Sequence, residues 1–147
     1  MRPRLVLAAG LLALAMSPLA AQAPGHVMVD PATLAWRGGN GISTAVAEGD
    51  PAKPGRFTML LKLADGAYIP PHWHNVDKRL VVVSGRLKMG MGDAIDETAV
   101  TLLGPGGVVV VPASSHHYEG GEGETVVALI ADGPFTTTYV GGATRDQ

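Results

Sequence analysis

The sequence predicts an all-β protein, either a sandwich or a closed barrel. Its 20 glycines and 11 prolines, together with few charged residues, favour many turns between short extended segments. Eight or more strand-like segments recur at spacings of about ten residues. No segment has the periodicity of a convincing helix. Because small barrels have room inside for one ligand, we expect any functional site in the interior.

The N-terminal half of the domain begins with an irregular segment and continues with strands. Residues 24–41 contain Pro31 and several glycines, so we expect a tail or an edge strand that wraps the domain. Strands are expected over residues 42–48 and 57–63, separated by a turn rich in Gly and Pro. A further strand is expected over residues 68–74, where two prolines fix an extended backbone just before two histidines.

The C-terminal half is predicted to contain only strands and turns. The β-branched run 79–83 is closed by Ser84-Gly85, and residues 86–91 are expected to be its hairpin partner. Residues 92–98 form a polar loop. The remaining predicted strands cover residues 108–111, 125–131 and 135–140.

The first residues have the three parts of an export signal. A basic region at residues 2–4 precedes an apolar region at 5–16 and a small-residue cleavage region at 17–23. The apolar run is shorter than the roughly 20 residues of a membrane-spanning helix. We therefore predict a signal peptide at residues 1–23 and a domain at 24–147 that is periplasmic or secreted, without membrane contact after the signal is removed.

Composition excludes several classes of function. The chain has no cysteine, so disulfides, Cys-ligated zinc and thiol nucleophiles are absent. Without Arg2 and Arg4, 9 of the 11 basic residues remain against 13 acidic residues, so the formal net charge changes from −2 to −4. This acidic balance argues against a nucleic-acid partner. No nucleophile elbow, phosphate loop or dinucleotide fingerprint is present, so any catalysis has to come from histidines.

Four of the five histidines stand in two short clusters, Pro-His-Trp-His and Ser-His-His-Tyr. His72 and His74 form a His-x-His pair, and on a strand such residues point to the same face, roughly 6.6 Å apart along the backbone. A third histidine from another strand, His117, would complete a metal site. The pattern therefore raises the question of what Lys78, four residues after His74, does there.

Two glycine-anchored motifs resemble those of the cupin superfamily. The first, G-x5-H-x-H-x3-E-x6-G, is matched by Gly66, His72, His74 and Gly85, with Lys78 at the position of the glutamate. The second, G-x5-P-x-G-x2-H-x3-N, is matched by Gly106, Pro112 and His117, with Ser114 and Gly121 as departures. The resemblance covers nearly the whole chain after the signal. Other segments resemble a subgroup of small exported cupins.

The resemblance implies a single small double-stranded β-helix (cupin) barrel over residues 24–147. It also implies that His72, His74 and His117 hold a divalent transition metal, namely Fe, Zn, Mn, Ni or Cu. We expect a metal-dependent enzyme acting on a small organic molecule, with a dioxygenase as one candidate. The alternative is a non-catalytic protein that binds a carboxylate or sugar through a degenerate metal site, since cupins include both classes.

Lys78 allows more than one interpretation. A cation close to a divalent ion lowers either the metal affinity or the pKa of the lysine. If Lys78 faces inward, it would coordinate as a neutral amine, pair with an anionic substrate or serve in proton transfer as a catalytic residue. We favour instead that Lys78 extends out of the barrel and leaves a three-histidine site with open positions. Asp77 would supply a carboxylate only if its strand carried a bulge.

Strand alternation predicts the direction of several other side chains. His116, Trp73 and Tyr118 are expected to face away from the three histidines, whereas Tyr68 shares their parity and is expected to point inward. The acidic residues of two turns are expected to be solvated; they are Asp93, Asp96, Glu97, Glu119, Glu122 and Glu124.

Two valine-rich runs, 81–83 and 108–111, are apolar on both faces. Such runs suit burial under a second sheet or in a homodimer. The expected partners are therefore a small-molecule ligand and a second copy of the chain.

Overall fold

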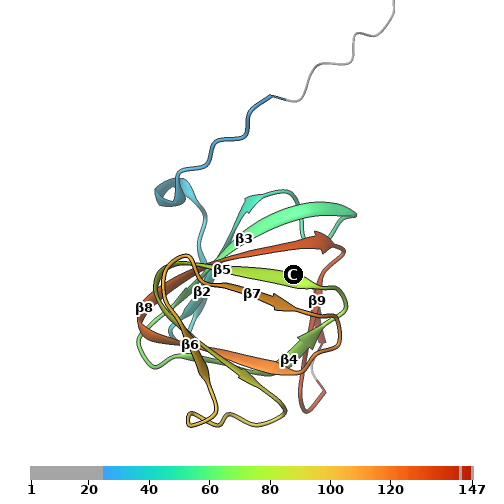
Figure 1. Ribbon diagram of the computed structural model, residues 1–147. Helices are drawn as coiled ribbons and strands as arrows, with labels where there is room; N and C mark the ends of the chain where they lie inside the picture. Colours follow the sequence, from blue (N-terminus) through green and yellow to red (C-terminus); the bar gives the residue numbers. More distant parts are fainter. Residues whose placement is uncertain (1–24, 143, 147) are drawn as a thin grey trace, which may run out of the picture.

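The strands form one curled antiparallel sheet that folds into a barrel (Figure 1). The structure is a computed structural model that describes residues 25–142 and 144–146, so the predicted signal peptide at 1–23 lies outside the described residues. The described elements are the 3-10 helix η1 (Pro31–Thr33) and the strands β1 (Arg37–Gly39), β2 (Ile42–Glu48), β3 (Gly55–Leu63), β4 (Tyr68–His74), β5 (Lys78–Met91), β6 (Thr101–Leu103), β7 (Val108–Val111), β8 (His117–Gly133), β9 (Thr136–Tyr139) and β10 (Thr144–Asp146). The predicted all-β barrel is confirmed.

The two longest strands, β5 and β8, run antiparallel to each other along most of their length. Residues 78–84 lie opposite 126–131, and residues 86–91 lie opposite 117–122. The predicted hairpin between 79–83 and 86–91 is therefore wrong, because Gly85 interrupts the pairing within a single strand without reversing it. Gly85 has φ +73°, which glycine adopts without strain, and the register shifts on either side of it.

Three of the predicted strands agree with the structure at both boundaries, whereas β8 begins at His117 and not at the predicted residue 125. Strands β2, β4 and β7 begin and end where the sequence places them. The N-terminal segment contributes the edge strand β1, which pairs with β2. Strand β6 was not predicted; it is only 3 residues long and pairs with the second half of β5.

The interior of the barrel is lined by alternate hydrophobic residues of the central strands. On β3 these are Phe57, Met59, Leu61 and Leu63, all buried. Burial of apolar surface contributes about 25 cal/mol per Å², so this lining is the main source of stability in a chain without disulfides. Polar side chains inside such a wall need partners, because an unpaired buried polar group is costly.

Among residues 25–142 and 144–146, no helix has both the length and the apolar character needed to cross a membrane.

Candidate metal centre

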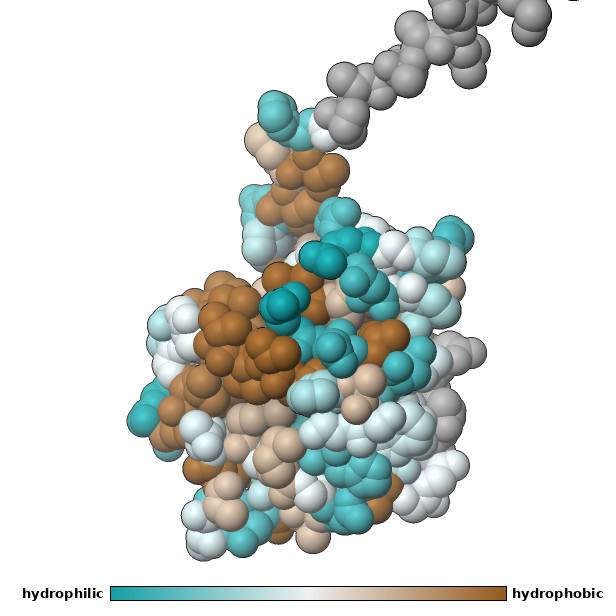
Figure 2. Space-filling view, turned by 45° about the vertical axis from the view of Figure 1, so that its right-hand side comes forward, coloured by the Kyte–Doolittle hydropathy of each residue, from teal (hydrophilic) through white to brown (hydrophobic). Residues whose placement is uncertain are grey.

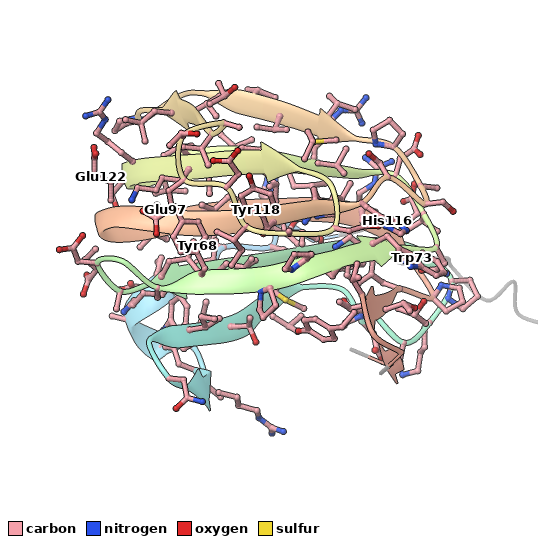
Figure 3. All side chains as sticks on the ribbon, turned by 90° about the horizontal axis from the view of Figure 1, so that it is seen from below. Tyr68, Trp73, Glu97, His116, Tyr118 and Glu122 are labelled. Carbon is pink, nitrogen blue, oxygen red and sulfur yellow. The ribbon has the colours of Figure 1, made fainter. Side chains whose placement is uncertain are left out.

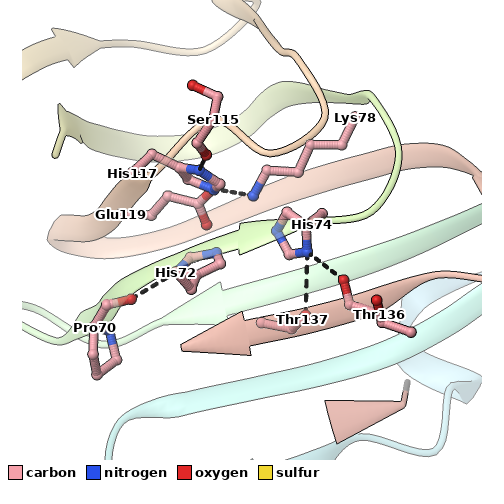
Figure 4. Close-up of polar contacts among 9 residues, drawn as sticks. All are labelled: Pro70, His72, His74, Lys78, Ser115, His117, Glu119, Thr136 and Thr137. Atoms are coloured by element: carbon pink, nitrogen blue, oxygen red, sulfur yellow. Dashed lines mark hydrogen bonds and ion pairs between the residues drawn. The ribbon is translucent and has the colours of Figure 1, made fainter. Parts of the chain in front are cut away.

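Three histidines from two paired strands converge inside the barrel (Figure 4). His72 and His74 lie on β4, and His117 opens β8 directly opposite His72. Their ring centroids are 4.9 Å apart for His72 and His74, 4.2 Å for His72 and His117, and 5.4 Å for His74 and His117. One ligand nitrogen of each ring lies within 4.8 Å of those of the other two. The structure therefore brings together the three histidines that the sequence singled out.

A bulge in β4 sets the direction of these side chains. Ile69 pairs with Glu119 and His72 pairs with His117, so β4 contains one extra residue between the two pairs. The extra residue falls at Pro70-Pro71, where neither residue has an N–H to offer a neighbouring strand. The bulge reverses the alternation ahead of His72, so the residues before it change faces.

Tyr68 consequently does not point into the barrel, and its predicted inward direction is wrong. Its ring lies beside that of Tyr118, with centroids 6.3 Å apart (Figure 3). The Lys88 ammonium lies 5.5 Å from the centre of the same ring. Tyr68 therefore contributes to the outer packing of the barrel and not to the metal centre.

Each of the three imidazoles is fixed by a hydrogen bond to a backbone carbonyl. The bonds run from Nδ1 of His72 to the carbonyl of Pro70 (2.7 Å), of His117 to Ser115 (2.8 Å) and of His74 to Thr136 (3.1 Å). A carbonyl oxygen only accepts, so Nδ1 carries the proton in each ring. In the neutral ring the lone pair then belongs to Nε2.

The donor set fits a divalent transition metal. The Nε2 atoms of His74 and His117 are buried and have no hydrogen-bond partner. Leaving a buried polar atom unsatisfied costs about 1–3 kcal/mol, and a metal ion accepts a lone pair of this kind. Metal-binding histidines commonly donate their other ring N–H to a carbonyl, as these three do. Zinc, iron, copper and nickel all suit neutral imidazole.

Burial keeps two of these rings neutral. Burial is the main cause that lowers the pKa of His72 to about 4 and that of His74 to about 2; the Glu119 carboxylate opposes this effect and the Lys78 ammonium adds to it. Neutral imidazole is the form that binds a metal, so protons compete weakly for these two rings near neutral pH.

Lys78 lies inside the barrel, ion-paired with Glu119 (Figure 4). Both side chains are only 1% exposed. The prediction that Lys78 extends out of the barrel is therefore wrong, and so is the prediction that Glu119 is solvated. Lys78 shares its strand face with the buried Leu80, and a buried carboxylate offsets the desolvation of its ammonium.

Glu119 is the site residue that sequence reasoning missed. It stands two residues after His117, so once β8 begins at His117 the two side chains share the inner face. The spacing His-x-Glu was the available signal, and it repeats the spacing of His72 and His74. The glycines that follow Glu119 suggested a turn and obscured this signal.

The Lys78–Glu119 pair is electrostatically coupled to the histidines. Burial opposes ionisation of Glu119, but the Lys78 ammonium outweighs it and holds the pKa of that carboxyl well below its ordinary value. Burial also lowers the pKa of Lys78, an effect that Glu119 opposes. Oε1 of Glu119 lies 3.4 Å from Nε2 of His117. The carboxylate therefore adjoins the nitrogen that is available to a metal.

A cavity of about 110 Å³ adjoins His72, His74, Lys78 and Glu119. Most of its remaining wall is apolar, contributed by Met59, Leu61, Ile69, Leu129 and Phe135. The Phe135 ring stacks on His74 with centroids 4.4 Å apart. The cavity has room for a small organic ligand beside the histidines.

The side chains expected to face away from the histidines do so. His116 stacks on Trp73 with ring centroids 6.3 Å apart and bonds Asp93 (Figure 3). Tyr118 also faces away but is fully buried, and its hydroxyl bonds both the N–H (3.0 Å) and the carbonyl (2.9 Å) of Asp96. Asp77 accepts a hydrogen bond from the backbone N–H of Ala113 at 2.8 Å, so its carboxylate holds a loop.

Comparison with known proteins assigns the family. A family model described as Cupin matches residues 51–134 of the 147, and the chain belongs to this family. A search of curated proteins found no match.

Among solved structures, the chain resembles an RmlC-like cupin protein from Ralstonia eutropha JMP134, with 20% identity, a TM-score of 0.61 and coverage of 81% of this chain and 78% of that one. It also resembles the polyketide cyclase RemF from Streptomyces resistomycificus, with 15% identity, a TM-score of 0.63 and coverage of 81% and 83%. A salicylate 1,2-dioxygenase from Pseudaminobacter salicylatoxidans matches with 17% identity, a TM-score of 0.58 and coverage of 70% and 31%. At these identities the likeness shows the cupin fold alone.

Proposed function

We propose that the protein is a metal-dependent cupin enzyme that acts on a small organic molecule. The observation that carries the proposal is the common orientation of His72, His74 and His117. All three rings bond a backbone carbonyl through Nδ1, which leaves three Nε2 lone pairs for one ion. When bound, a divalent transition metal would polarise a substrate oxygen as a Lewis acid or, if it is iron, supply dioxygen chemistry.

The composition of the cavity wall favours a small and largely apolar substrate. Ile69, Leu129 and Phe135 would hold its carbon skeleton and exclude water, while the histidine side of the cavity would face its polar group. Lys78 is the candidate catalytic residue for proton transfer. Its amine lines the same cavity and donates a hydrogen bond to the Glu119 carboxylate, so a proton can pass between the two groups.

The second candidate function is non-catalytic binding of a carboxylate or sugar. The lysine in place of the family's glutamate supports it, since a cation replaces a metal ligand. The ion pair between Lys78 and Glu119 weighs against it, because an ammonium that is already neutralised captures a second carboxylate less strongly.

The metal content of the untagged protein tests the proposal. We expect about one equivalent of iron, zinc, manganese, nickel or copper per chain after challenge and desalting, measured by mass spectrometry. Replacing His72, His74 or His117 by Ala should remove it. The matched control is His116→Ala, which removes a neighbouring imidazole on the outer face and should leave the metal content unchanged.

If the wild-type protein holds substoichiometric metal after challenge with each of the five ions, the proposal is contradicted and the non-catalytic binding function is favoured. The enzymatic part is tested by turnover of a panel of small aromatic and aliphatic acids, alcohols and ketones, with oxygen uptake recorded. Turnover should require the metal, disappear on chelation and survive in His116→Ala.

We also propose that the protein is exported to the periplasm or secreted, on the evidence of residues 1–23. Fractionation of the producing cell and N-terminal sequencing of the protein test this. A cytoplasmic protein that keeps residues 1–23 would contradict it.

A further inference from the structure

The buried charges of this barrel stand in an unusual arrangement. In the family motif, the carboxylate belongs at the position of Lys78, at the start of β5. Here the carboxylate comes from β8 as Glu119, and an ammonium occupies the position on β5. The inference drawn from this exchange rests on the proposed metal site.

Glu119 and His117 face each other through two acceptor atoms. Oε1 of Glu119 lies 3.4 Å from Nε2 of His117. The ring proton of His117 is on Nδ1, where it bonds the carbonyl of Ser115, so no hydrogen lies between Nε2 and the carboxylate. Two lone pairs that face each other in a buried site repel unless they share a cation.

The separation of these atoms matches that of two ligands on one ion. Ligand atoms bound at about 2.1 Å with a tetrahedral angle between them lie about 3.4 Å apart. Lys78 bonds Oε1 of Glu119, but a carboxylate has two oxygens and about four lone pairs. The same carboxylate therefore has the capacity to hold the ammonium and a metal together.

We propose that Glu119 is a fourth protein ligand of the metal, supplied by β8 in place of the glutamate of the family motif, and that Lys78 is its positioning residue. The ammonium fixes the carboxylate beside His117. It also balances the carboxylate's charge, so the interior is close to neutral before an ion enters.

Cobalt(II) binding tests this assignment, because the visible absorption of cobalt reports its ligands independently of any activity. Affinity and spectrum are compared for the wild type, E119Q, K78M/E119Q and the control E122Q, whose exposed side chain pairs with Arg86. We expect E119Q and K78M/E119Q to bind cobalt at least about 10-fold more weakly with an altered spectrum. E122Q should match the wild type.

The double variant K78M/E119Q distinguishes two roles of Glu119, namely metal ligand and counterion of Lys78. If Glu119 only neutralises Lys78, K78M/E119Q removes both charges, and its cobalt affinity and spectrum will equal those of the wild type; that result overturns the proposal. If circular dichroism shows E119Q to be unfolded, K78M/E119Q decides, because it leaves neither charge of the pair unpartnered. If the wild-type protein takes up no cobalt, both this inference and the proposed function are wrong. If K78M/E119Q binds cobalt with the affinity and spectrum of the wild type, only this inference is wrong.

Discussion

At the scale of single residues, the Lys78–Glu119 ion pair makes each charge dependent on the other. Both groups are 1% exposed, so neither is solvated by water. We predict that Lys78→Met lowers the free energy of unfolding by about 3–5 kcal/mol, because it leaves a buried carboxylate unpaired. Urea denaturation of the metal-free protein measures this.

Two variants control that measurement. K78M/E119Q should recover most of the loss, because no unpaired charge remains. Lys53→Met breaks an exposed ion pair with Asp50 and should leave the unfolding transition unchanged. A Lys78→Met protein as stable as Lys53→Met would show that the pair does not hold the interior together.

The buried histidines predict a dependence of stability on pH. The pKa of His72 is lowered to about 4 and that of His74 to about 2, so between about pH 4 and 6.5 the unfolded chain binds protons that the folded chain does not. Stability of the metal-free protein should therefore be complete above pH 6.5 and fall as the pH drops through this window. Urea titrations from pH 7 to 4.5 should show uptake of about two protons on unfolding from these residues. His72→Gln/His74→Gln should flatten the slope; an unchanged slope would contradict the assignment.

At the scale of elements, the turn after β4 connects the metal centre to β9. Asn75 donates to the carbonyl of Pro134 (2.9 Å) and accepts from the N–H of Thr136 (2.8 Å), and the carbonyl of Thr136 holds the ring of His74. We predict that Asn75→Ala costs about 1–2 kcal/mol of stability, because two hydrogen bonds are lost. It should also weaken metal binding by about 10-fold, since His74 loses its support.

Chelator competition measures the change in metal affinity. Thr98→Ala is the control, because it removes a side-chain bond to Asp96 (2.6 Å) in the loop before β6. This variant should bind metal like the wild type. An Asn75→Ala protein with unchanged metal affinity would show that the turn does not orient His74.

Local sequence patterns predicted only part of the metal centre. His-x-His and His117 were predictable because spacing and alternation act locally, and the convergence of the three rings follows once β4 and β8 pair. The first half of β8 was not predictable in the same way, since Gly120 and Gly121 are poor strand formers and owe their extended form to pairing with β4 and β5. The direction of Tyr68 depended on a bulge that the two prolines create.

Glu119 and Lys78 were misassigned for a related reason. A charged side chain is rarely fully buried, so a solvated position is the ordinary expectation for each one alone. Only the pairing of strands far apart in sequence shows that the two charges neutralise each other inside the barrel. Their burial is a property of the pair and not of either residue.

At the scale of the whole molecule, the outer wall formed by β5 and β7 favours association. Val83, Val108 and Val110 are 54%, 57% and 56% exposed, and β5 pairs with β7. Figure 2 shows a hydrophobic area on the barrel below the N-terminal segment. Exposed apolar surface of this kind marks an interface, and we predict a homodimer through this wall.

Size-exclusion chromatography with light scattering tests the dimer. The wild type should have twice the mass of one chain, and Val108→Lys/Val110→Lys should be monomeric because two ammonium groups replace apolar contacts. A wild-type monomer at every concentration would exclude the dimer.

The proposed activity of the barrel requires one ion bound by three imidazoles in the interior. X-ray absorption at the zinc K-edge, on protein loaded with one equivalent of zinc and desalted, tests this most directly. We predict three imidazole nitrogens at about 2.0–2.1 Å, with the outer-shell scattering that imidazole rings produce. A spectrum without imidazole scattering, or a protein that loses its zinc on desalting, would show that the three histidines do not hold a metal ion.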